Sequence, residues 1–111
     1  MDSVLAALQD TLEQRKSAEP DGSYVASLYA KGLNEILEKI GEEATEVILA
    51  AKDYDETRES RSALIGEIAD LWFHSLVAMT HLGLSHAEVE AELARRFGIS
   101  GLAEKAARSE A

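Results

Sequence analysis

The chain has 111 residues and a formal net charge of −10 at pH 7, because 21 acidic side chains outnumber 11 basic ones. Nucleic acid and anionic membranes would repel such a charge, so we expect neither as a partner. Aromatic residues make up only 5% of the sequence, against 46% for all hydrophobic residues, and there is one proline and no cysteine. This composition favours a single all-α domain over residues 1–111 and excludes a disulfide framework.

The first two predicted elements are short helices joined by a loop. A first helix should begin at residues 2–3, where either side chain can cap it, and end by Ser17. Residues 17–23 read SAEPDGS and predict a loop, since proline, aspartate and glycine favour turns. A second helix should then run to about Ala30, and Gly32 should break or bend the chain behind it.

A long amphipathic helix is predicted from Leu33 to Asp53, where apolar residues recur with a period of 3.6. Glu43 lies on the apolar row of this helix, where a charge is not expected. Glu46 follows it by three residues and Glu42 precedes Glu46 by four, so these carboxylates share a face. Like charges at such spacings destabilise a helix by about 0.2–0.5 kcal/mol per pair, even when they are exposed.

A second long helix should follow a short polar connection at residues 53–57, and the shortness of this connection predicts antiparallel packing. The helix should run from about residue 58 to residue 81 or 82. Its stretch 62–80 is apolar nearly all round, with Glu67 and Asp70 as its only formal charges. The stretch approaches membrane-spanning length, but inserting each acid would cost about 2.5–3.5 kcal/mol, which indicates a core helix.

The last predicted helix opens with a capping box, Ser85-x-x-Glu88, and ends near Phe97 before Gly98. A polar, partly helical tail follows. The elements together predict an all-α helical bundle of about five helices around a long antiparallel central pair.

A dimer is expected to complete this bundle, because one antiparallel partner cannot cover a helix that is apolar on every side. The alternative is that the first and last helices cover the remaining face within one chain. Residues expected in or near the dimer interface are Leu71, Trp72, Leu76 and Met79.

Antiparallel packing would bring the two acidic pairs face to face. Stretch 62–80 contains no Lys or Arg, so a cation shared between the helices would compensate the buried charge. Ligand sets made only of carboxylates suit magnesium, manganese or calcium. Di-iron bundles instead use Glu-x-x-His pairs, and no histidine here has a glutamate three residues before it. We therefore predict a divalent-metal site at Glu43, Glu46, Glu67 and Asp70, the alternative being solvated acids.

The motif Glu-x-x-Glu, a spacer of twenty residues and Glu-x-x-Asp resembles the all-α nucleotide pyrophosphatase superfamily, which includes MazG-like enzymes and dimeric dUTPases. Two flanking stretches are similar to a narrower family, the phosphoribosyl-ATP pyrophosphatases. They are SYVASLYAKGLNEILEKIGEEATEVILAAKD at residues 23–53 and RRFGISGLAEKAAR at residues 95–108. Family members are often fused to a cyclohydrolase, for which 111 residues leave no room, so we expect the activity to stand alone.

The resemblance implies hydrolysis of 1-(5-phosphoribosyl)-ATP to phosphoribosyl-AMP and pyrophosphate, the second step of histidine biosynthesis, with Mg²⁺ as cofactor and a homodimer as the assembly. Catalytic candidates are Glu42, Glu43 and Glu46, with Glu42 as outer ligand or water-activating base. Candidates for binding the substrate are Lys31, Lys39, Lys105, Arg108 and Tyr24. His74, four residues after Asp70, is interpreted as a core histidine rather than an outer group of the site.

Two other functions stay open at this point. One is a house-cleaning pyrophosphatase of free nucleoside or deoxynucleoside triphosphates, and the other is a non-enzymatic helical dimerisation module. Because the N-terminus lacks the basic start and long apolar run of a secretory signal, we expect a cytoplasmic protein.

Overall fold

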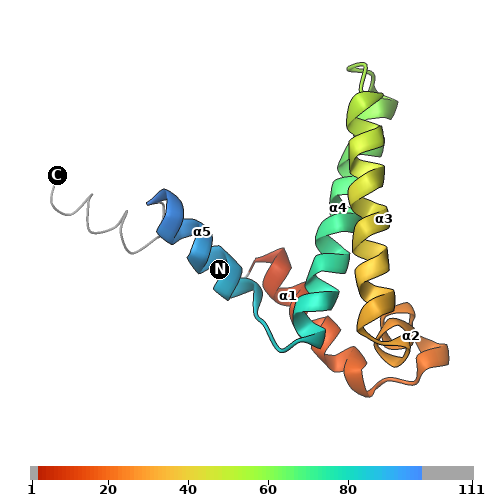
Figure 1. The fold of residues 1–111 in the computed structure, drawn as a ribbon, viewed down its shortest axis with the longest axis vertical. Helices are drawn as coiled ribbons and strands as arrows, with labels where there is room; N and C mark the ends of the chain where they lie inside the picture. Colours follow the sequence, from red (N-terminus) through yellow and green to blue (C-terminus); the bar gives the residue numbers. More distant parts are fainter. Residues whose placement is uncertain (1–2, 99–111) are drawn as a thin grey trace, which may run out of the picture.

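A computed structural model describes residues 3–98, shown as a ribbon in Figure 1. This part of the chain is all-α, as predicted, and contains no strand. Its five α-helices are α1 (Val4–Gln14), α2 (Tyr24–Lys31), α3 (Leu33–Lys52), α4 (Arg58–His81) and α5 (His86–Phe97). The predicted loop at 17–23 is partly wrong, because two 3₁₀ turns, η1 (Arg15–Ser17) and η2 (Pro20–Gly22), shape the connection from α1 to α2.

The helices begin and end where short polar residues and glycines predict. Ser3 and Ser23 each accept a backbone N–H at the start of their helix, and Ser85 forms the predicted capping box with Glu88. Gly32 separates α2 from α3 with φ of 99°, a conformation that side chains with a Cβ rarely adopt. A glycine is therefore required at the point where the chain turns into the long helix.

The antiparallel arrangement of α3 and α4 depends on a tight polar turn between them. Thr57 caps α4 by accepting the Ser60 N–H, and Asp55 Oδ1 accepts both the hydroxyl and the N–H of Thr57, at 2.6 and 3.1 Å. These bonds, led by the one from the Thr57 hydroxyl, lower the pKa of Asp55 to about 2. These hydrogen bonds thus stabilise the turn that makes α4 run back antiparallel to α3.

The hydrophobic core lies at one end of the α3–α4 pair. In Figure 1, α1 and α2 lie against the lower part of the pair, whereas the end with the α3–α4 turn stands clear of the other helices. The fully enclosed side chains come from all four of these helices. They are Leu12, Leu28, Ile36, Val77 and Thr80. The core therefore involves one half of the pair. In the other half, α3 and α4 pack only against each other.

The surface of α4 is divided by this arrangement. Leu76, expected near a dimer interface, is only 4% exposed and belongs to the chain's own core, so that expectation is wrong for this residue, because α1 covers this end of α4. Trp72, one helical turn earlier, is 58% exposed. By length and composition alone, α4 is the single helix in residues 3–98 that could cross a membrane, a criterion that core helices also meet.

Candidate metal centre

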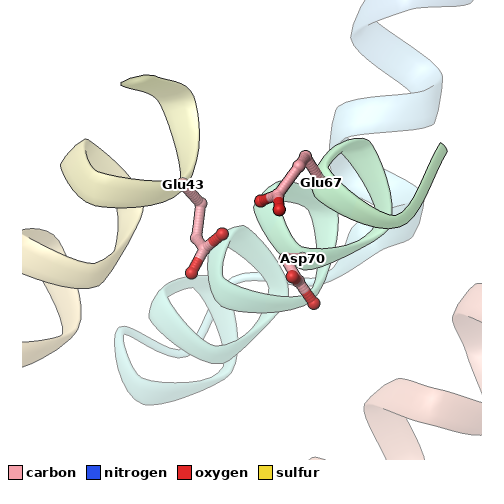
Figure 2. Close-up of side chains that lie close together, drawn as sticks. All are labelled: Glu43, Glu67 and Asp70. Atoms are coloured by element: carbon pink, nitrogen blue, oxygen red, sulfur yellow. The ribbon is translucent and has the colours of Figure 1, made fainter. Parts of the chain in front are cut away.

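Three carboxylates from the two long helices converge between α3 and α4. Figure 2 shows Glu43 reaching from α3 toward Glu67 and Asp70 on α4. One carboxylate oxygen from each residue lies within 4.8 Å of the other two. Glu43 and Glu67 are half-buried and Asp70 is exposed. The antiparallel packing thus brings the two acidic motifs together at one place, as their spacing predicted.

The carboxylates repel one another in the absence of a cation. Partial burial raises the pKa of Glu67 above its ordinary value of 4.5, and the negative charges of Glu43, Glu46 and Asp70 raise it further. Within residues 3–98, none of the ion pairs shorter than 4.0 Å joins Lys or Arg to the three clustered acids. The described part of the chain therefore leaves the charge of these three acids without an ion-pair partner.

The donor set fits a hard divalent cation. All three side chains offer oxygen, the ligand that magnesium and calcium prefer. In octahedral coordination, oxygens on opposite sides of a magnesium ion lie roughly 4.1 Å apart and neighbouring ones about 2.9 Å, since each Mg–O distance is about 2.0–2.1 Å. The three oxygens, which lie within 4.8 Å of one another, must therefore move closer together to share one magnesium ion.

Glu46, the fourth predicted ligand, is not part of this three-residue cluster. It is exposed, although its charge contributes to the raised pKa of Glu67. Glu46 therefore lies at the rim of the cluster.

The other predicted site residues are distributed around the cluster or fall outside the described part of the chain. Lys39 Nζ lies 3.3 Å from Glu42 Oε2 in an ion pair on the surface of α3, one turn before Glu43. Lys31 is exposed at the last residue of α2. Lys105 and Arg108 lie outside residues 3–98.

Tyr24, a predicted substrate-binding residue, is hydrogen-bonded to His74. Its hydroxyl lies 2.8 Å from Nε2 of His74, and Nδ1 of His74 lies 2.8 Å from the main-chain oxygen of Asp70. His74 is a core histidine, as interpreted, with 6% of its surface exposed, yet both ring nitrogens bond toward the acidic site. The spacing of four residues after Asp70 is the sequence signal that points to this link.

The model of the phosphoribosyl-ATP pyrophosphohydrolase family matches residues 5–97, which is most of the chain and includes all the acids of the site. The chain belongs to this family. It is accordingly a phosphoribosyl-ATP diphosphatase of histidine biosynthesis, a hydrolase that acts on a phosphoric anhydride, as the flanking stretches of the acidic motif predicted.

Proposed function

We propose that hydrolysis of phosphoribosyl-ATP by this protein depends on Mg²⁺ bound by Glu43, Glu67 and Asp70, with Glu46 at the rim as a further ligand. The observation that carries the proposal is the convergence of three carboxylate oxygens within 4.8 Å, from two helices, at a site where no Lys or Arg of residues 3–98 forms an ion pair with them. Magnesium bound there would neutralise the negative charge that builds up on the phosphate oxygens during the reaction.

The chain's own residues supply the remaining steps. Lys39 and Lys31 are the proposed phosphate contacts, with Lys105 and Arg108 as further candidates. When Lys39 turns toward a phosphate, its ion pair with Glu42 opens, which costs little because exposed ion pairs are weak. The freed Glu42 carboxylate can then take a proton from the attacking water. Water adds to the α-phosphorus, the bond to the β-phosphate breaks, and pyrophosphate leaves.

The magnesium requirement is tested by measuring pyrophosphate release from phosphoribosyl-ATP with magnesium, with a chelator, and with magnesium restored after chelation. We expect activity only in the first and third conditions, and a panel of deoxynucleoside triphosphates as much poorer substrates. Calorimetric titration of magnesium into the substrate-free protein should show binding, because the acidic cluster is already formed in the folded protein before substrate binds. Unchanged turnover in chelator would contradict the proposal.

Lys39→Met should raise the KM for phosphoribosyl-ATP by about tenfold or more, the effect expected when a charged hydrogen bond to a phosphate is lost. The chain offers a matched control in Lys16→Met. Lys16 pairs with Glu13 at the same three-residue spacing and at 3.2 Å, but on the connection after α1 rather than beside the acids. Similar KM values for the two variants would remove Lys39 from the binding site.

A homodimer is the proposed assembly. The half of the α3–α4 pair that α1 and α2 leave uncovered carries large exposed apolar residues on both helices, namely Ile48, Leu49 and Ile65. The exposed Trp72 lies at the border of this half, where it lines an apolar groove with Leu5 of α1 and Val89 of α5. The Cα radius of gyration is 17.1 Å, against roughly 13 Å for a compact domain of about 100 residues. Packing two such pairs against each other would form a four-helix bundle and cover these residues.

A further inference from the structure

A row of two hydrogen bonds crosses from α2 to the ligand-bearing turn of α4. It runs from the Tyr24 hydroxyl to Nε2 of His74, and from Nδ1 of His74 to the main-chain oxygen of Asp70, each at 2.8 Å. Asp70 and Glu67 lie on this turn, and their side chains belong to the acidic cluster. The His74 ring also meets Phe73 and Tyr24 edge to face, with centroids 5.1 and 5.9 Å away.

The chemistry of the partners fixes the direction of both bonds. A main-chain carbonyl oxygen can only accept, so Nδ1 of His74 carries the proton. In a neutral imidazole the other nitrogen is then an acceptor, so the Tyr24 hydroxyl must donate to Nε2. This donation uses the single proton of the hydroxyl. The Tyr24 oxygen therefore offers only lone pairs to its remaining neighbours.

Charged side chains of α3 act electrostatically on this oxygen, among them Glu43 of the candidate metal centre. Tyr24 is half exposed, and burial of the rest of the side chain raises the pKa of its hydroxyl. The positive charge of Lys39 lowers this pKa, while the negative charges of Glu43 and Glu42 raise it, so the hydroxyl lies within electrostatic reach of these side chains. Magnesium in proteins usually keeps several waters, each of which donates hydrogen bonds outward. An oxygen that can only accept is a suitable partner for such a water.

We propose that Tyr24 and His74 are positioning residues of the metal centre: His74 holds the turn that carries Glu67 and Asp70, and Tyr24 accepts a hydrogen bond from a water that the metal would hold. The inference rests on the proposed magnesium site. Groups in this second layer orient the direct ligands, and their loss typically lowers metal affinity or activity by about 10- to 100-fold. Tyr24 thereby has a proposed role in metal binding in place of the predicted role in substrate binding.

The test is calorimetric titration of magnesium into the substrate-free protein and its Tyr24→Phe variant. We expect the variant to bind magnesium about two- to tenfold more weakly, as the loss of one ordinary hydrogen bond implies. Tyr29→Phe is the matched control, because the Tyr29 hydroxyl lies on the same helix and donates to the main-chain oxygen of Leu12, away from the acids. Equal magnesium affinities in the two variants would overturn the role of Tyr24.

His74 is tested in two ways. Nitrogen NMR of the metal-free protein should show His74 as the Nδ1–H tautomer, and the Nε2–H tautomer would overturn the proposal even if every variant failed to fold. His74→Gln, whose amide oxygen can still accept a hydrogen bond from Tyr24, should bind magnesium more tightly than His74→Leu. If both variants bind magnesium as tightly as the unaltered protein, the role proposed for His74 is wrong. Absence of magnesium binding by the unaltered protein would overturn the metal site itself, an outcome distinct from equal affinities among variants.

Discussion

Glu67→Gln should reduce turnover of phosphoribosyl-ATP by more than about a hundredfold while making the metal-free protein more stable to heat. The loss of turnover follows because removing even an indirect partner of a metal ligand typically costs about 10- to 100-fold, and Glu67 is a proposed direct ligand. The gain in stability follows because burial and the neighbouring carboxylates raise the pKa of Glu67. A neutral amide relieves that repulsion.

The stability difference should depend on pH in a defined direction. The folded-state pKa of Glu67 lies above the ordinary value of 4.5, so the folded protein binds this proton more tightly than the unfolded chain does. The corresponding stabilisation is complete below pH 4.5 and is lost as the pH rises through the folded-state pKa. Glu67→Gln should therefore melt at a higher temperature than the unaltered protein at pH 7, and the difference should vanish toward pH 4.5.

Magnesium should reverse the order of the two melting temperatures at pH 7. A ligand that binds only the folded state stabilises it by an amount that grows with the logarithm of the ratio of ligand concentration to Kd. Because the variant lacks one carboxylate, it should bind magnesium more weakly and gain less stability from it. Glu38→Gln is the control, since Glu38 is exposed on the same α3 helix that carries Glu43 but is not in the acidic cluster. A variant that keeps full activity, or that melts lower without metal, would show that the cluster is not a cation site.

Helix boundaries could be predicted from the sequence because local chemistry sets them. Ser3, Ser23 and Ser85 satisfy free amides whatever the rest of the chain does, and Gly32 adopts a backbone conformation that other residues avoid. The 3₁₀ turns before α2 were missed, since proline and glycine indicate a change of direction without indicating how tightly the chain coils.

The candidate site could be predicted only as far as helical periodicity reaches. Spacing alone placed Glu43 opposite Glu67 and Asp70, because a short connection forces α3 and α4 to be antiparallel. It could not separate Glu43 from Glu46, because the choice depends on how far α3 is rotated about its axis when it packs on α4. The bond from Tyr24 to His74 joins residues fifty positions apart and depends on where α2 packs, which no local pattern encodes.

Trp72→Glu should convert the proposed dimer to a monomer at micromolar concentration, with a dimer Kd raised by at least about thirtyfold. That factor corresponds to the loss of about 2 kcal/mol when an aromatic residue at the centre of an interface is replaced. Trp72 is 58% exposed in the single chain, and covering an indole removes a large apolar area from water. A glutamate at this position would place a carboxylate without a partner in an apolar contact, which is strongly unfavourable.

Sedimentation velocity of the two proteins over a range of concentrations measures this change directly. Leu82→Glu is the matched control, because Leu82 is similarly exposed, at 54%, but lies at the C-terminal end of α4, far along the helix from the uncovered half of the pair. We expect this control to stay dimeric. If Trp72→Glu also stays dimeric, the surface of α4 around Trp72 is not part of the interface. If the unaltered protein is a monomer at every concentration, this apolar surface has no partner copy and the proposed four-helix bundle is wrong.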